Sequence, residues 1–211
     1  MADGPALAAP YRPCRRRAVI PAARPPEFRG GVLGGIDWER WSVVLLKPDC
    51  VRLGLADAVL DRLATVADVS ARTTLTVADW QVFVHYWDLL VDADWFDVDV
   101  PGALRAMYVG QRVTVALAHG PVGIAGTLRG LLGHFDPSQA AAGTIRGDLG
   151  TDSLAAARAE GRLVHNLVHT SDDPAAARRD FGTWYGAHQH QLLHPTLPDL
   201  PHARDARRPQ P

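Results

Sequence analysis

The chain contains little cysteine and no long apolar run. Its two cysteines, Cys14 and Cys50, are too few for a disulfide framework or a zinc cluster, which favours a reducing compartment. No stretch approaches the roughly 20 apolar residues of a membrane span, and the N-terminus shows no signal-peptide core. We therefore expect a cytoplasmic protein with no membrane contact.

A charge excess of one sign is also missing, because the 211 residues carry a formal net charge of −1. The chain therefore has no general attraction to nucleic acid or to anionic membranes, and local groups must hold any phosphate ligand. Lysine is scarcer still: of the 22 basic residues only Lys47 is a lysine, and the others are arginines. A lysine kept against that bias suggests a site that needs a compact, flexible ammonium group.

Composition divides the chain into three parts. Residues 1–37 are rich in Pro, Arg, Ala and Gly without a sustained helical or strand period, which predicts a flexible arm. The Pro-rich residues 194–211 are predicted to be a disordered tail. With 47% hydrophobic residues the chain can bury one substantial core, so we expect a single domain over residues 38–193.

Within this domain the apolar periodicity predicts alternating strands and helices. The predicted strands cover residues 41–46, 69–77, 111–118 and 162–168. The predicted helices cover residues 54–67, 78–90, 104–108, 121–132, 153–161 and 174–185, with a long loop over residues 133–150. This order favours an α+β fold, a ferredoxin-like antiparallel sheet (βαββαβ core) with helices packed on one face.

His169 is the first candidate for catalysis. The stretch RLVHNLVHTSDD places it at the end of a predicted strand, directly before turn and helix-capping residues. A histidine held there can face a cleft, where an imidazole serves as a nucleophile or a general base. Taken alone, it can equally be a structural histidine. Lys47 also follows a predicted strand, because Pro48 ends that strand.

Five motifs in a fixed order give these residues a context: VVLLKPD (43–49), HY (85–86), LRGLLG (128–133), GTIRGD (143–148) and NLVHTSD (166–172). With them the chain resembles the nucleoside diphosphate kinase family over residues 41–185. The resemblance implies a ping-pong reaction on nucleoside di- and triphosphates. A nucleoside triphosphate would give its γ-phosphoryl group to His169, and phospho-His169 would pass it to a nucleoside diphosphate.

The resemblance also implies which residues bind the nucleotide. Lys47, Arg129 and Arg146 match the family's phosphate-binding cations, Tyr86 would lie near Lys47 at the phosphates, and Asn166 would bind the sugar. GTIRGD is expected to place Arg146 in a glycine-flanked loop, where backbone and guanidinium can both approach a phosphate.

The remaining positions implied by the family complete the predicted site. Asp180 stands where the family has a glutamate that orients the histidine, one methylene longer, and Ser171 would support this carboxylate. The base would stack on Trp95 or Phe96. The resemblance also implies that magnesium arrives with the nucleotide phosphates and not in a protein cage, which is consistent with the absence of a clustered carboxylate motif.

Several positions depart from the family pattern. Phe135 replaces a phosphate-contacting threonine at the nucleotide, and Thr170 replaces the glycine after the histidine, which adds a β-branched side chain beside the nucleophile. Segments 92–110 and 151–162 are longer than in the family. The loop before the catalytic strand builds trimer contacts of the family's hexamers, so a homo-oligomer is one assembly that the resemblance allows.

These departures leave alternatives to an active kinase. The same fold could serve as a nucleotide-binding regulatory or assembly module with weak or no turnover. A phosphotransferase for a non-nucleotide acceptor is a third reading. The joint presence of the cations, Tyr86, Asn166 and His169 favours the enzyme, since a pure scaffold has no need of the whole set.

Overall fold

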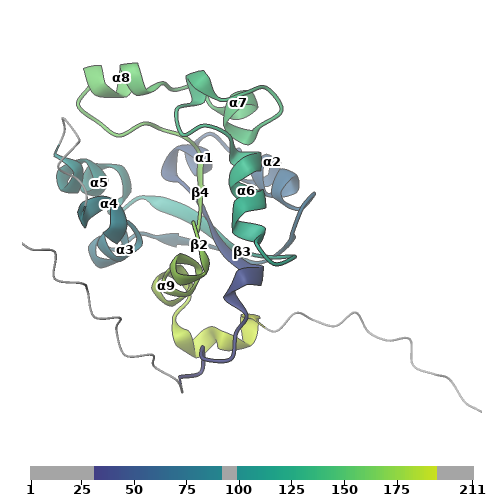
Figure 1. The fold of residues 1–211 in the computed structure, drawn as a ribbon. Coiled ribbons are helices and arrows are strands. Elements are labelled where there is room, and N and C mark those ends of the chain that lie inside the picture. Colours follow the sequence, from purple (N-terminus) through teal and green to yellow (C-terminus); the bar gives the residue numbers. More distant parts are fainter. Residues whose placement is uncertain (1–30, 92–98, 194–211) are drawn as a thin grey trace, which may run out of the picture.

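A four-stranded sheet with the order β2-β3-β1-β4 forms the centre of the computed structural model, which describes residues 31–91 and 99–193 (Figure 1). The strands are β1 (Trp41–Leu46), β2 (Asp68–Thr76), β3 (Arg112–His119) and β4 (Val168–Thr170). Every neighbouring pair is antiparallel. The predicted α+β fold with a ferredoxin-like antiparallel sheet is therefore confirmed.

Strand β1 is apolar on both of its sides. All six of its residues are buried. Val43 and Leu45 belong to one hydrophobic cluster, whereas Val44 and Leu46 belong to another. Successive side chains of a strand point to opposite faces, so a continuous apolar run needs cover on both. The prediction that the helices pack on one face is therefore wrong.

Each face of the sheet has its own set of helices (Figure 1). Buried residues of α3 (Asp79–His85), α5 (Val100–Tyr108) and α9 (Pro174–Trp184) share a cluster with Leu45. Buried residues of α1 (Pro48–Arg52), α2 (Ala56–Leu63), α6 (Ile124–Leu132) and α7 (Ile145–Leu149) share the other cluster with Val44. The shorter elements are η1 (Trp38–Arg40), α4 (Trp87–Val91), η3 (Pro137–Gln139), α8 (Leu154–Ala159) and η4 (Ala187–Leu193).

Several predicted boundaries are wrong, and the helix predicted over residues 104–108, for example, begins at Val100. The helix predicted over residues 78–90 is interrupted at Tyr86, which adopts φ −98° and ψ 24° after α3. Helix α6 begins at Ile124 rather than Pro121, because Gly123 precedes it in the left-handed conformation with φ 82°. The predicted loop over residues 133–150 contains η3 and α7, so Arg146 lies in a helix and not in a loop.

Strand β4 overlaps the predicted strand over residues 162–168 only at Val168, so the prediction is wrong for residues 162–167. Leu167 has a positive φ of 69°, which no extended strand accommodates, so pairing starts at Val168. His169 is thus the central residue of β4 and the Cα partner of Leu45. Because directly paired residues of an antiparallel sheet point to the same face, His169 shares the face of α3 and α9.

The predicted arm and tail lie largely outside the described residues. Within the described part of the arm, Leu33 is buried in the core and Ile36 packs against it, so the folded part begins before the predicted boundary at residue 38. Among the described residues, no helix is both long and apolar enough to span a membrane.

Candidate active site

A cavity of about 330 Å³ lies where the end of β1 meets β4, and α3 and α6 contribute to its walls. Seven residues singled out from the sequence line it together: Lys47, Tyr86, Arg129, Phe135, Arg146, Asn166 and His169. Ser171 and Asp180 are fully buried and do not line it. Trp95 and Phe96 lie outside the described residues. The fold thus gathers into one cavity side chains that come from all five motifs.

His169 presents its imidazole to this cavity from the centre of β4. Removal from water lowers the pKa of His169 well below its usual value, and the nearby His85, Lys47, Arg146 and Arg129 lower it further. The ring is therefore neutral at pH 7, with a free lone pair on one nitrogen. A neutral imidazole among cations is chemically suited to attack an electrophilic phosphorus atom.

Lys47 is a buried cation at the end of β1, with 8% of its surface exposed. Burial lowers its pKa from 10.5 to about 8, against an opposing effect of the Asp49 carboxylate. Its backbone N–H donates to the carbonyl of Leu167 at 2.8 Å, which ties the end of β1 to the chain entering β4. The charge of this ammonium group therefore depends on pH near neutrality.

Arg146 is built into the wall of the cavity. Its guanidinium donates to the backbone carbonyls of Gly133 at 3.0 Å, Asn166 at 3.2 Å and Val168 at 2.8 Å. Burial, followed by the nearby Arg129, lowers the pKa of Arg146 to about 10, so it stays charged at neutral pH. Three of its five N–H donors hold the backbone around His169, and two remain for a ligand.

Arg129 on α6 has a different setting. Its side chain is 54% exposed and forms an ion pair with Asp172. Asp88, the other carboxylate lining the cavity, pairs with Arg179 at 2.9 Å. Each carboxylate that faces the cavity from the described residues is therefore paired with an arginine, so neither is free to start a protein cage for a metal.

Tyr86 is held in place by a residue that the sequence analysis did not single out. Its hydroxyl group is hydrogen-bonded to the hydroxyl group of Tyr108 on α5. Burial raises the pKa of both phenols, so both stay protonated. Lys47 Nζ lies 5.9 Å from the centroid of the Tyr108 ring. Residues 92–110, predicted as a longer segment, thus contribute a structural support to the site.

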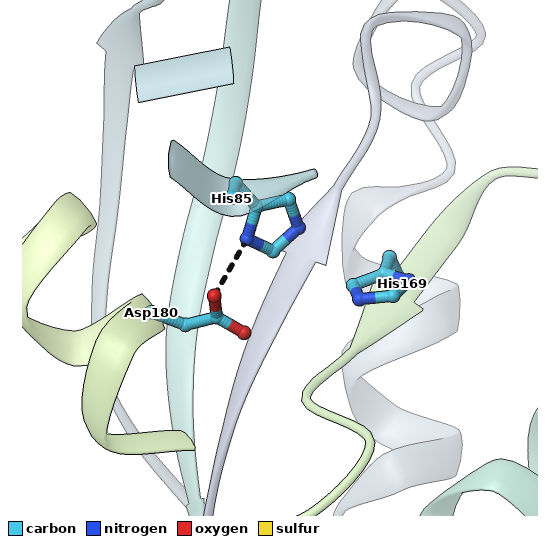
Figure 2. A group of neighbouring side chains, drawn as sticks. All are labelled: His85, His169 and Asp180. Carbon is cyan, nitrogen blue, oxygen red and sulfur yellow. Dashed lines mark hydrogen bonds and ion pairs between the residues drawn. The ribbon is translucent and has the colours of Figure 1, made fainter. Parts of the chain in front are cut away.

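Asp180 contacts His85 and not His169. Its Oδ1 lies 2.9 Å from His85 Nδ1, and its Oδ2 accepts a 2.8 Å hydrogen bond from Ser171 Oγ. Figure 2 shows the His85 ring beside both the carboxylate and His169, with the dashed contact running from Asp180 to His85. The predicted direct contact between Asp180 and His169 is therefore absent, whereas the predicted contact between Ser171 and Asp180 is present.

His85 is the site residue that sequence reasoning missed, although it stands in the HY motif. It is 3% exposed, and its Nε2 has no hydrogen-bond partner. Together, His85, His169 and Asp180 bring possible metal ligands within 4.8 Å of one another. Both Asp180 oxygens already accept hydrogen bonds, and Lys47 and Arg146 add positive charge nearby, so this group is a poor site for a resident cation.

Comparison with known proteins places this cavity in a family. Residues 40–190 match the family model of nucleoside diphosphate kinase, which covers more than half of the chain. The chain belongs to the nucleoside diphosphate kinase family. The nucleoside diphosphate kinase of Streptococcus thermophilus (strain CNRZ 1066) is 31% identical over 142 residues, 67% of this chain and 95% of that protein. That of Nocardia farcinica is 34% identical over 146 residues, 68% of this chain and 93% of that protein.

Solved structures of nucleoside diphosphate kinases share the fold. A transition-state mimic of the Borrelia burgdorferi enzyme with bound vanadate and ADP aligns with a TM-score of 0.63 and 27% identity, over 69% of this chain and 86% of that chain. The halophilic enzyme from Halobacterium salinarum, in complex with CDP, aligns with a TM-score of 0.55 and 28% identity over the same shares.

The two substitutions noted in the sequence of this family member have different settings. Phe135 lines the cavity with a 50% exposed side chain. Its carbonyl accepts a 2.8 Å hydrogen bond from Asn166 Nδ2, whereas Asn166 Oδ1 has no partner. Thr170 lies in β4 and is not among the described residues with a positive φ, so its β-branched side chain meets no backbone strain.

Proposed function

We propose that this protein transfers the γ-phosphoryl group of a nucleoside triphosphate to a nucleoside diphosphate through a phospho-His169 intermediate. The observation that carries the proposal is the meeting, in one cavity, of a neutral imidazole with the cations Lys47, Arg129 and Arg146. A phosphoryl-transfer site needs an aligned nucleophile and fixed positive charge more than it needs covalent machinery.

In the first half-reaction, the lone pair of a His169 nitrogen attacks the γ-phosphorus. The N–P bond forms while the bond from phosphorus to the β-phosphate oxygen breaks, and that oxygen keeps the electron pair as the diphosphate leaves. The three cations offset the charge on the phosphate oxygens throughout. In the second half-reaction a β-phosphate oxygen of another diphosphate attacks phospho-His169, which restores the free imidazole.

The other lining residues would bind the rest of the nucleotide. We assign Tyr86 to the phosphates beside Lys47 and Asn166 to the sugar, a role supported by the unpartnered Asn166 Oδ1. Phe135 stands at the phosphate position where the family has threonine. Stacking of the base on Trp95 or Phe96 stays a prediction.

Mg²⁺ would be held mainly by the nucleotide phosphates. Mg²⁺ keeps several waters and needs few protein ligands, and the pairing of Asp88 and Asp172 with arginines leaves no ready cage among the described residues. When bound, it would offset negative charge on the phosphates. Asp172, which lines the cavity beside Arg129, is the residue that would accept hydrogen bonds from its waters.

A nucleotide-binding module without turnover is the second candidate. Two features favour it: Phe135 replaces a phosphate-contacting hydroxyl with an exposed ring, and Asp180 does not touch His169. Either feature would slow phosphoryl transfer while leaving the cationic cavity able to bind phosphates.

Incubation with γ-labelled ATP distinguishes the two candidates. An active kinase should yield an acid-labile, alkali-stable phosphoprotein that a nucleoside diphosphate discharges. His169→Ala should abolish the label, whereas the matched control His165→Ala, at a histidine outside the cavity, should retain it. A wild-type protein that binds nucleotide and stays unlabelled would establish the module instead.

Two wider proposals rest on the family and the composition. We propose a cytoplasmic location, supported by the scarcity of cysteine and by the free, buried Cys50. We also propose a homo-oligomer, supported by family membership. Cell fractionation and light scattering of the purified protein test these two statements.

A further inference from the structure

One buried imidazole has no role in the reaction described so far. His85 ends α3 on the same sheet face as His169, and its side chain is entirely buried. Its two ring nitrogens differ, since Nδ1 contacts Asp180 whereas Nε2 has no partner. A buried polar atom without a partner costs free energy, so a role in a later state of the site would explain its presence.

Two groups contact His85 Nδ1, the Asp180 carboxylate and the Trp184 indole. An ionised carboxylate only accepts, so the 2.9 Å contact between Asp180 Oδ1 and His85 Nδ1 requires a proton on Nδ1. The indole N–H of Trp184 also points at this Nδ1, over a longer distance of 3.2 Å. A hydrogen bond to an ionised carboxylate is the stronger of the two, so we infer that Nδ1 carries the proton and donates to Asp180. In the neutral ring Nε2 then carries a lone pair and is a hydrogen-bond acceptor.

This acceptor lies on the side of His169. Figure 2 shows one nitrogen of His85 on Asp180 and the other on the side facing His169. The two rings meet edge to face, with centroids 4.8 Å apart and an interplanar angle of 84°. Ligand-free active sites often hold such pairs slightly apart, and the hydrogen bond forms when the substrate binds.

We propose that His85 is the positioning residue of His169, whose non-attacking nitrogen donates its N–H to His85 Nε2 in the phosphorylated state. This proposal rests on the proposed phosphohistidine reaction. As the N–P bond forms, the His169 ring becomes positively charged and its remaining N–H becomes a stronger donor. His85 accepts that hydrogen bond, and its own Nδ1–H donates to Asp180. His85 and Asp180 thereby stabilise the positive charge of the His169 ring, and no proton leaves the three residues.

The shorter carboxylate explains why an imidazole takes this position. Asp180 is one methylene shorter than the glutamate that the family resemblance implies here, and Ser171 and His85 occupy both of its oxygens. The orienting role is then divided between Asp180, which fixes the tautomer of His85, and His85, which contacts the nucleophile.

Single-turnover phosphorylation by γ-labelled ATP tests this assignment. His85→Ala should form phospho-His169 about 100-fold more slowly, because His169 loses the acceptor that orients its ring, with the nucleotide dissociation constant unchanged within about twofold. His85→Ala combined with Asp180→Glu should recover at least about tenfold of the rate, because the longer carboxylate can enter the vacated space and reach His169 directly.

Trp184→Phe is the matched control. It removes the indole N–H beside His85 Nδ1 and keeps an aromatic ring, so its rate should stay within about threefold of wild type. A rate as low as that of His85→Ala would overturn the assigned tautomer. The ¹⁵N spectrum of the wild-type protein tests the tautomer directly, and a proton on His85 Nε2 would overturn the proposal even if His85→Ala does not fold.

The remaining outcomes separate this proposal from the reaction on which it rests. A labelled wild type together with a folded His85→Ala variant that is phosphorylated at the wild-type rate overturns the role of His85 alone. A wild type that stays unlabelled overturns the phosphohistidine reaction and the role of His85 together.

Discussion

The inner wall and the rim of the cavity are built in different ways. The inner wall includes Lys47, His85 and Arg146, which are all buried. The rim consists of Arg129, Asp172 and Phe135, which are about half exposed. Each wall residue hydrogen-bonds other parts of the protein, whereas the ionic groups of the rim contact each other and solvent. We therefore expect changes in the wall to alter stability and chemistry together, and changes in the rim to alter only ligand affinity.

The largest effect is expected for Arg146→Ala. This change leaves the carbonyls of Gly133, Asn166 and Val168 without their donor, which should lower the free energy of unfolding by about 3 kcal/mol or more. Urea unfolding measures it. Arg146→Lys is the control and should recover only part of the loss, because one ammonium group cannot replace the planar fork. A stability within about 1 kcal/mol of wild type would show that the wall does not depend on Arg146.

Lys47 should give the wall a pH response that the rim lacks. Its pKa of about 8 means that the ammonium is charged below pH 8 and neutral above it, so nucleotide affinity should fall about tenfold from pH 7 to pH 9. Stability should change in the opposite direction: the unfolded chain binds the proton more tightly, so stability rises between pH 8 and 10.5.

Calorimetric titration with a nucleoside diphosphate at several pH values tests the first part, and urea unfolding tests the second. Lys47→Arg supplies the control, since guanidinium stays charged and should remove the fall in affinity up to pH 9. If the nucleotide affinity of the wild-type protein does not change over this pH range, the charge of Lys47 does not contribute to nucleotide binding.

A smaller effect is expected at the rim for Arg129→Gln. The side chain is 54% exposed, so its loss should weaken nucleotide binding by about fivefold. The free energy of unfolding should stay within about 0.5 kcal/mol of wild type, in contrast to the inner-wall variant Arg146→Ala. Parallel titrations and urea curves of the two variants compare wall and rim directly, and a strongly destabilised Arg129→Gln would remove the distinction.

The smallest effect is expected for Phe135→Thr. If the missing hydroxyl limits phosphate binding, its restoration should tighten nucleotide binding about threefold, since the position is half exposed to water. Weaker binding, measured by the same titration, would indicate that the ring itself contacts the nucleotide.

The residues around the cavity differ in how far the sequence predicts them. Short continuous motifs contain Lys47, Arg146, Asn166 and His169. The antiparallel pairing of β1 with β4 brings the end of β1 close to His169. The motifs and the fold class were therefore enough to predict that these residues share one site. The apolar run WSVVLL already contained the evidence that β1 is covered on both faces, which the predicted single helical layer ignored.

The contacts behind His169 depend on geometry that a sequence pattern does not contain. His85 occupies its place because α3 ends there, and the break at Tyr86 turns the next residues away. Whether Asp180 reaches His169 or stops at His85 depends on one methylene group and on the position of α9. Helix α7 was missed because its five residues are too few to establish a helical period.

The pairing of Leu45 with His169 decides to which face of the sheet the His169 ring points, and activity depends on that face. A slip of β4 by one position would set His169 opposite Val44 or Leu46 and turn its ring toward α2 and α6, away from His85 and Tyr86. Two hydrogen bonds at Leu167 oppose that slip: its carbonyl accepts from Lys47 N–H at 2.8 Å, and its own N–H donates to Asp49 Oδ2 at 2.9 Å. Without these hydrogen bonds, a three-residue strand at the edge of a sheet could pair in a shifted register. The protein would then be folded but would have no nucleophile in its cavity.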